Sequence, residues 1–226
     1  MSRLTSRNLR ILHEDRDLLV VCKEPGLLTT SYDGDRNATA ERLLTNYLRK
    51  GSSRSWVRAY TVHRLDRETS GLLIFAKSAA VQQQLKDNWK AVEKHYTAVV
   101  HGSLAQKSGT ISSYLAENAD QFVYSTPDAA QGKWSETLYQ VVRETPRFSL
   151  LDVTLLTGRK NQIRVHLAEA GHPVAGDAKY GRKGDRIARM ALHARTLSFP
   201  HPHDGRLLAF EAPVPAVILQ LVDPAR

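Results

Sequence analysis

The stretch TVHRLDRETSGLLIFAK, residues 61–77, places a dense run of charged and hydroxyl side chains directly before a continuous apolar segment. The apolar part, 72–77, predicts a buried strand, because an unbroken apolar run after polar residues is typical of a strand covered on both faces. The polar part, 61–71, then becomes the loop that enters this strand. Binding and catalytic residues concentrate on loops that a rigid scaffold holds in place.

Within this loop Asp66 is separated from Arg64 by one residue and is followed directly by Arg67. Nearby cations favour the ionised form of a carboxyl group, so we expect Asp66 to carry a charge. An ionised carboxylate can act as a nucleophile or as a base, or it can be an ion-pair partner that fixes the loop. The residue pattern alone leaves these roles open.

A second polar segment, TGRKNQIRVHL at residues 157–167, follows a predicted strand and opens a predicted helix. It continues through GHPVAGDAKYG at residues 171–181. The two polar segments are therefore the candidate functional regions of the chain.

The surrounding pattern predicts runs of short strands with a few helices between them, which favours an α+β fold with a largely antiparallel sheet over a βαβ alternation. The predicted strands cover residues 9–13, 18–22, 72–77, 94–101, 110–115, 121–125, 137–142, 148–156, 192–194 and 207–210. The predicted helices cover residues 39–50 (capped by Thr39), a segment capped by Ser78 that carries Val81, Leu85 and Trp89 on one face, 162–170, and a short segment from Pro215.

The chain has 226 residues, 42% of them apolar, and a net charge of +9, which excludes a fibrous or an acidic protein. Its basic residues are concentrated in two blocks. Residues 36–67 hold 8 basic and 2 acidic side chains, and residues 158–195 hold 9 basic and 3 acidic side chains. If the fold brings these blocks together, they form the positive surface that a polyanion such as a nucleic acid requires.

The sequence lacks the patterns that are typical of several other classes of protein. The single cysteine, Cys22, lies in an apolar run and predicts a core residue in a reducing cytoplasm. The chain shows no signal peptide, no apolar run long enough for a membrane span, and no phosphate-binding or dinucleotide-binding glycine motif. The pair His201 and His203 lacks the further ligands that a metal site needs, so we expect no metal.

The segment HRLDRETSG at 63–71 resembles the signature of RluA-type pseudouridine synthases, His-Arg-Leu-Asp-x-x-Thr-Ser-Gly. The segments at 158–166 and 171–181 resemble the Gly-Arg-x-x-Gln-Ile-Arg-x-His motif of that family and its extension. Residues 20–27 and 94–102 resemble two further family motifs, and order and spacing agree over about residues 9–222.

The resemblance implies a catalytic role for Asp66, Tyr96 and Arg164. Asp66 would attack C1′ of the target uridine, or remove a proton from C2′, and either route breaks the glycosidic bond so that uracil can turn and rejoin the ribose through C5. Tyr96 would pack on uracil and handle the C5 proton, and Arg164 would hold the carboxylate of Asp66. An isomerisation of this kind needs no cofactor.

Further residues at family positions are expected to bind RNA or the uridine: His63, Arg64, Arg67, Arg159, Lys160, Gln162, Ile163 and Leu167. Arg64 would fill the gap that the flipped uridine leaves. His63 and His166 fit a structural hydrogen-bonding role as well, and Ile163 and Leu167 fit either a pocket wall or a plain core. Lys160-Asn161 and Glu24-Pro25-Gly26 depart from the commoner family sequence, which leaves the catalytic positions untouched.

These observations predict an N-terminal tail at 1–8 and one catalytic domain at 9–226, with the family's mixed, mostly antiparallel sheet flanked by helices and a central basic cleft. We expect no separate S4-type RNA-binding domain, a monomer in the cytoplasm, and ribosomal or transfer RNA as the partner, without DNA or membrane. A non-catalytic RNA-binding or chaperone protein on the same fold is the alternative. A glycosidase that releases uracil is a third interpretation.

Overall fold

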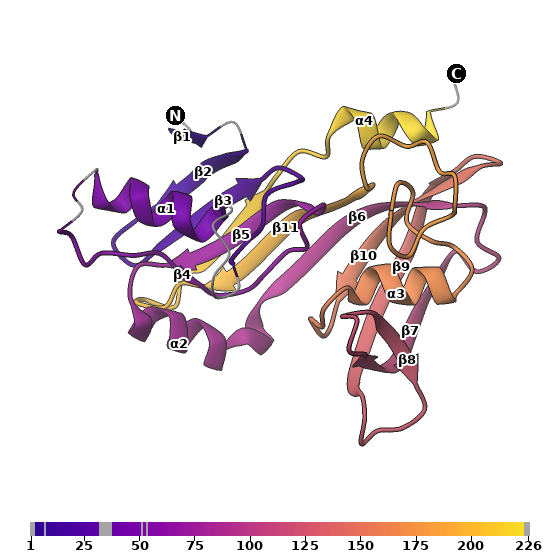
Figure 1. Cartoon of the computed structure of the whole chain (residues 1–226), viewed down its shortest axis with the longest axis horizontal. Coiled ribbons are helices and arrows are strands. Elements are labelled where there is room, and N and C mark those ends of the chain that lie inside the picture. Colours follow the sequence, from indigo (N-terminus) through magenta and orange to yellow (C-terminus); the bar gives the residue numbers. More distant parts are fainter. Residues whose placement is uncertain (1–2, 7, 32–37, 51, 53, 224–226) are drawn as a thin grey trace. The chain divides into compact units, whose positions relative to one another are not determined.

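The computed structural model describes residues 3–6, 8–31, 38–50, 52 and 54–223. The chain divides into two compact units, shown in Figure 1. Unit 1 comprises Met1–Glu93 and Ala194–Ala212, and unit 2 comprises Lys94–His193 and Pro213–Arg226. The predicted helix at 39–50 is described, but the basic block at 36–67 begins outside the described residues.

Unit 1 is built on adjacent strands in the order β1, β2, β3, β5 and β11, with β4 beside β5 and β12 beside β11. The pairs β1–β2, β2–β3, β3–β5, β4–β5 and β11–β12 are antiparallel. The bounds are β1 (Arg3–Ser6), β2 (Leu9–Glu14), β3 (Leu18–Lys23), β4 (Tyr60–Thr61), β5 (Ser70–Ala76), β11 (Leu192–Pro200) and β12 (Leu207–Glu211). A strand, β1, thus lies in the segment expected as a tail.

The core of unit 1 forms around β3 and β5, whose residues are buried along their whole length, as the continuous apolar runs predict. Cys22 is buried in this core, and burial raises the pKa of its thiol, which keeps the thiol protonated and unreactive. The prediction of a core cysteine is therefore confirmed.

Two helices of unit 1 begin at the predicted caps. The Oγ1 of Thr39 accepts the Arg42 N–H at 3.1 Å at the start of α1 (Ala40–Arg49), and the Oγ of Ser78 accepts the Val81 N–H at 3.2 Å at the start of α2 (Ala79–Asp87). Helix α2 ends before Trp89, which lies in a following 3₁₀ turn, η1 (Trp89–Ala91), but still packs on the same core.

Unit 2 is built on adjacent strands in the order β6, β10, β9, β7 and β8, each antiparallel to its neighbour. The bounds are β6 (Glu93–His101), β7 (Ser108–Glu117), β8 (Val123–Thr126), β9 (Lys133–Glu144), β10 (Phe148–Leu155), α3 (Gln162–Glu169), α4 (Ala216–Leu219) and η2 (Gln220–Val222). The predicted hairpin is β9–β10, whose turn is closed by the Thr145 N–H on the Phe148 carbonyl at 2.8 Å. The predicted α+β class with a mostly antiparallel sheet is confirmed.

Among the described residues, no helix is both long enough and apolar enough to cross a membrane. The α-helices described above have between four and ten residues, far fewer than the roughly 20 that a span requires.

Gly71 is the second residue of β5, directly after the polar loop, and it has a φ of +116°. A Cβ at this position would lie 2.2 Å from the carbonyl oxygen of Ala194, which belongs to the same unit. Only glycine fits there, because the conformation disfavours any side chain and the neighbouring atoms are backbone.

Gly71→Ala is therefore expected to lower the free energy of unfolding by about 3 kcal/mol or more, since it adds backbone strain to a steric clash. Urea unfolding monitored by circular dichroism measures the change. Gly158→Ala is the matched control, because a Cβ there meets nothing within 4 Å, and it should change stability by well under half as much. Equal effects of the two variants would contradict the steric argument.

Candidate active site

The backbone before Asp66 is fixed by a distant hydroxyl group. The Oγ1 of Thr29 donates to the Leu65 carbonyl at 2.9 Å and accepts the Leu65 N–H at 3.2 Å. Both groups are buried, so these hydrogen bonds compensate for the removal of the polar atoms from water. Thr29 therefore holds the residue that precedes Asp66 at both of its backbone polar groups.

The backbone after Asp66 is fixed by the segment that follows β3. The carbonyl of Arg67 accepts the Gly26 N–H at 2.9 Å and the Nζ of Lys23 at 3.0 Å. In return, the Nε of Arg67 donates to the Gly26 carbonyl at 3.0 Å. Lys23 is fully buried, and it also donates to the Glu24 carbonyl at 3.0 Å. The unusual Glu24-Pro25-Gly26 sequence thus lies next to the loop of Asp66.

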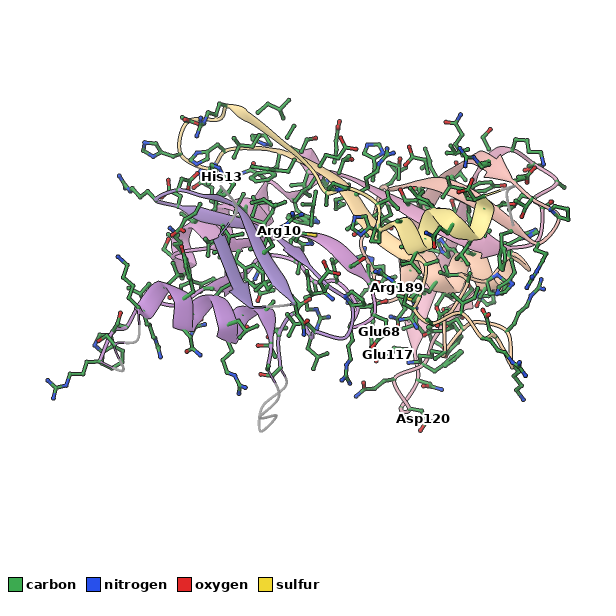
Figure 2. All side chains as sticks on the ribbon, turned by 90° about the horizontal axis from the view of Figure 1, so that it is seen from above. Arg10, His13, Glu68, Glu117, Asp120 and Arg189 are labelled. Carbon is green, nitrogen blue, oxygen red and sulfur yellow. The ribbon has the colours of Figure 1, made fainter. Side chains whose placement is uncertain are left out.

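Asp66 itself is half-buried, and its carbonyl accepts the Thr69 N–H at 3.1 Å in a turn that leads to β5. Because the residues on both sides are held by hydrogen bonds, the backbone from which the Asp66 carboxylate extends is fixed as well. Figure 2 labels Glu68, an exposed acidic residue of the same turn. Glu68 serves below as the comparison for Asp66.

His63 and Arg64, which precede Asp66, have different surroundings. The Nε2 of His63 accepts the Ile74 N–H at 3.2 Å, and its ring lies 5.0 Å from the ring of Trp89. These contacts favour the structural interpretation of His63. Arg64 is exposed, as a side chain that enters RNA must be. Its contact with RNA stays a prediction.

In unit 2, Tyr96 lies on β6 opposite Val153 of β10, and it is 6% exposed. Lys94, two residues earlier on the same face of the strand, is also buried, and burial lowers the pKa of its ammonium group. The neighbouring His95 contacts the Oγ1 of Thr154 through Nδ1 at 3.0 Å. Tyr96 therefore stands on a strand with fixed neighbours.

Arg164 is held by a carboxylate for which the sequence predicted no role. Its Nε donates to Oδ2 of Asp177 at 2.6 Å, and its Nη2 donates to Oδ1 at 2.8 Å, which makes a bidentate pair. Asp177 also accepts the N–H groups of Lys179 and Tyr180, at 2.9 and 3.0 Å. The Cζ of Arg164 lies 5.0 Å from the centroid of the Tyr180 ring, in a cation–π contact.

The charge of Asp177 follows from these partners. Burial raises the pKa of its carboxyl group, but hydrogen bonds and the charge of Arg164, together with two backbone N–H groups, outweigh burial and leave the pKa below its usual value. Asp177 therefore stays ionised at neutral pH and orients the guanidinium of Arg164. The expected pairing of Arg164 with Asp66 stays a prediction.

Gln162 organises the loop before α3. Its Oε1 accepts the Thr157 hydroxyl at 2.8 Å and the Arg159 N–H at 3.0 Å. Its Nε2 donates to the Glu136 carbonyl at 2.9 Å and to the Thr137 hydroxyl at 3.0 Å. Gln162 is buried, so these bonds within unit 2 engage the amide at both ends. Its expected contact with RNA stays a prediction.

The adjacent Lys160-Asn161 departure has structural consequences of its own. The Nζ of Lys160 pairs with the carboxylate of Glu117 on β7, and Asn161 adopts a left-handed conformation with a φ of +54° that starts α3. Asparagine tolerates this conformation better than most residues. Arg159 is exposed, and its Nε donates to the Trp134 carbonyl at 3.3 Å.

The two apolar residues predicted for the uridine pocket lie on α3. Ile163 is 4% exposed and Leu167 is completely buried. His166, on the same helix, contacts the hydroxyl groups of Ser113 at 3.1 Å and Thr137 at 2.8 Å, and burial lowers the pKa of its imidazole. These surroundings fit the structural role for His166 and a core position for Leu167.

Among the described residues, no three His, Cys, Asp or Glu side chains form a group that could hold a metal ion. The residues whose supporting role the sequence did not reveal are Lys23, Thr29, Asp177 and Tyr180. Asp177 and Tyr180 stand in the quoted segment 171–181, so the motif marked their position but not their partners.

The chain is similar in sequence and in fold to known proteins. The family model for RNA pseudouridylate synthase matches residues 17–169, well over half of the chain, and this range contains Asp66, Tyr96 and Arg164. The chain is 37% identical over 232 residues to the ribosomal large subunit pseudouridine synthase D of Nitrosomonas europaea, with 95% of this chain and 65% of that protein covered. It is 36% identical over 225 residues to the uncharacterized RNA pseudouridine synthase YlyB of Bacillus subtilis, with 97% of this chain and 73% of that protein covered.

The chain therefore spans about two thirds of the length of these curated relatives. Solved structures agree on the fold. Human RNA pseudouridylate synthase domain containing 4 superposes with a TM-score of 0.76 at 23% identity, over 94% of this chain and 92% of that one. Human RNA pseudouridylate synthase domain containing 1 gives 0.74 at 28% identity, over 94% and 86%. The chain belongs to the RNA pseudouridylate synthase family, a family of isomerases.

Proposed function

We propose that this chain converts uridine to pseudouridine in RNA. The observation that carries the proposal is that the range matched by the family model contains the three chemically competent residues, and that each stands on a segment fixed by buried hydrogen bonds or strand pairing. A protein that only binds RNA has no chemical need for a fixed carboxylate among phosphate-binding cations. This argues against the non-catalytic alternative.

The proposed reaction breaks the N1–C1′ bond of the uridine and forms a C5–C1′ bond, while the proton at C5 is removed and N1 gains one. The carboxylate of Asp66 starts the reaction, either by attack on C1′ or by removal of the C2′ proton. Both routes conserve atoms and electrons within the nucleotide and the enzyme, so no external co-reactant is required.

Tyr96 supports the proposal as the aromatic side chain against which uracil packs and turns, with its hydroxyl group available for the C5 proton. Arg164 supplies a positive charge that keeps the reacting carboxylate ionised. Its bidentate bond to Asp177 fixes the guanidinium plane before substrate binds, which reduces the reorganisation that the reaction requires.

We further propose ribosomal RNA of the large subunit as the substrate class. Two relatives, from Nitrosomonas europaea and Neisseria meningitidis, are named for that subunit. The net charge of +9 favours a polyanionic partner, with phosphate contacts supplied by exposed side chains such as Arg159. The individual uridine depends on RNA structure, since unpaired loops are the usual targets of specific recognition.

Asp66→Asn tests the proposed function, because it keeps the size of the side chain and removes the charge that the chemistry needs. We expect uridine conversion in large-subunit ribosomal RNA to fall by at least about 10³-fold, while the Kd for the RNA stays within a few-fold. Uridine and pseudouridine have the same mass, so the conversion is measured by liquid chromatography of the nucleosides from digested RNA, which separates the two isomers, after incubation with the purified chain.

Glu68→Gln is the matched control, since Glu68 is an exposed acid in the same turn, and its conversion rate should resemble that of the wild type. Conversion that survives Asp66→Asn would show that Asp66 is not the reacting carboxylate. Release of free uracil by the wild type would instead favour a glycosidase. RNA binding by the wild type without conversion would favour the non-catalytic alternative.

Asp177→Asn tests the support of Arg164. The loss of a charged partner is expected to lower the single-turnover rate of conversion by about tenfold to a hundredfold through misplacement of the guanidinium, with little change in the Kd for RNA. Asp185→Asn is the control, because Asp185 also stabilises this loop through His101 and the Gly176 N–H but does not contact Arg164 in the bonds described. An equal loss of rate in both variants would contradict the specific role of Asp177.

Asp177→Asn should also change how the free energy of unfolding depends on pH in the acidic range. The folded pKa of Asp177 lies below its unfolded value near 3.8, so its stabilisation is complete above that value and is lost as the pH falls through the folded pKa. The free energy of unfolding of the wild type should therefore decrease more steeply below about pH 4 than that of Asp177→Asn. Parallel curves from pH 5 to pH 2 would contradict an ionised Asp177 in the folded state.

A further inference from the structure

A surface hollow of about 260 Å³ lies within unit 2, outside the residues to which the proposed chemistry assigns a role. Three parts of the chain form it: the start of β8, one face of α3 and the loop that follows Asp177. Its lining residues are Phe122, Val123, Val165, Ala168, Glu169, Lys179, Tyr180 and Gly181.

The side chains of α3 that line the hollow follow the helical repeat. Val165, Ala168 and Glu169 stand at positions i, i+3 and i+4, which places them on one face of the helix. Arg164 is not among the lining residues, but it contacts the Tyr180 ring at 5.0 Å. The hollow and the proposed catalytic arginine therefore share one aromatic side chain.

Two aromatic rings with a cation beside them give the hollow its chemical character. The ring of Phe122, which is 38% exposed, lies 4.7 Å from the ring of Tyr180 at an angle of 44°. The Nζ of Lys179 lies 5.5 Å from the Phe122 centroid and 5.6 Å from the Tyr180 centroid. An exposed aromatic next to a cation is the combination that binds the bases and phosphates of unpaired nucleic acid.

Hydrogen bonds fix this wall before any ligand arrives. The hydroxyl of Tyr180 accepts the Val123 N–H at 3.0 Å and donates to Oδ1 of Asn161 at 3.3 Å. The N–H of Phe122 donates to Oδ1 of Asn118 at 2.8 Å, and the Nζ of Lys179 donates to the Gln121 carbonyl at 2.6 Å. In Figure 2 the label Glu117 marks the end of β7, and the label Asp120 marks the turn that leads to β8.

Glu169 adds an acceptor at the rim of the hollow. It is exposed, and its Oε1 accepts the Ser125 N–H at 2.9 Å. A carboxylate can accept up to about four hydrogen bonds, so it retains capacity for a ligand that donates N–H groups. The floor beneath it is apolar, formed by Val123, Val165 and Ala168. A flat ring with an amino group at its edge and a phosphate beside it matches these surfaces.

We propose that this hollow binds an unpaired amino-bearing nucleobase of the RNA substrate, adenine, cytosine or guanine, with the ring on Phe122 and Tyr180, the amino group at Glu169 and a neighbouring phosphate at Lys179. The proposal rests on the proposed function for the presence of RNA. It adds a second nucleotide site, separate from the target uridine, that anchors the RNA next to Arg164 through Tyr180.

Binding of fluorescein-labelled ten-nucleotide RNAs to the full chain tests the site, with fluorescence anisotropy as the measurement. We expect oligoadenylate and oligocytidylate to bind more tightly than oligouridylate. Phe122→Ala should raise the Kd for oligoadenylate about tenfold, since base stacking contributes on that scale, and Phe122→Trp should retain binding. Glu169→Gln should reduce the preference for amino-bearing bases over uracil.

Tyr124→Ala is the matched control, because Tyr124 lies two residues from Phe122 with nearly equal exposure but does not line the hollow. Its Kd should stay within twofold of the wild type. Ultraviolet cross-linking of oligoadenylate followed by peptide mass spectrometry should place adducts on Phe122 or Tyr180. Wild-type affinity in Phe122→Ala, or adducts confined to other peptides, would overturn the proposal.

The outcome is separable from that of the proposed function. If the wild type forms pseudouridine but Phe122→Ala binds all three RNAs as the wild type does, the second nucleotide site is wrong and the synthase activity stands. If Phe122 governs the affinity for oligoadenylate but the wild type forms no pseudouridine in ribosomal RNA, the site stands and the proposed function is wrong.

Discussion

The candidate site of unit 1 depends on the hydrogen bonds that the buried ammonium group of Lys23 donates. This group donates to the carbonyls of Arg67 and Glu24 at 3.0 Å each, at a position with no exposure to solvent. A buried cation is costly unless hydrogen bonds compensate for its loss of water, so the bonds fix the backbone firmly. Since Arg67 follows Asp66 directly, the backbone beside the proposed reacting carboxylate is held by a lysine that lies 44 positions before Arg67.

A buried charged group has the same effect in unit 2, where a carboxylate fixes the position of a guanidinium group. Asp177 holds Arg164 with two hydrogen bonds and is itself held by the N–H groups of Lys179 and Tyr180. In each unit a buried charged side chain supports a functional side chain of the opposite charge: Lys23 supports the loop of Asp66, and Asp177 supports Arg164. A side chain held in this way loses less freedom when substrate binds, which is the main source of preorganisation in active sites.

Sequence reasoning succeeded where the determining interactions are local. The caps at Thr39 and Ser78, the buried strand at 72–77 and the hairpin whose turn lies at 143–147 each depend on residues within a few positions of one another. The predicted helix after Ser78 continued to Trp89, but in the structure α2 ends at Asp87. Apolar spacing marks a buried face and does not fix the last turn of a helix.

The supporting residues of the site could not be predicted in the same way. Thr29 and Leu65 are 36 positions apart, and no periodicity relates them. Asp177 stands in a loop 13 positions after Arg164, so the motif showed both residues without showing that they pair. Such contacts are decided by how loops pack in three dimensions. The aromatic hollow at Phe122 was missed for the same reason, because β8 and the loop after Asp177 are distant in sequence.

The central claim is that this chain isomerises uridine in RNA through Asp66. Pseudouridine mapping of total RNA by carbodiimide modification tests it most directly, in cells that lack the chain and in the same cells supplied with either the wild type or Asp66→Asn. We predict that one or more uridines in large-subunit ribosomal RNA lose the modification without the chain, and that only the wild type restores it. A map that is unchanged by the deletion, or restoration by Asp66→Asn, would contradict the claim.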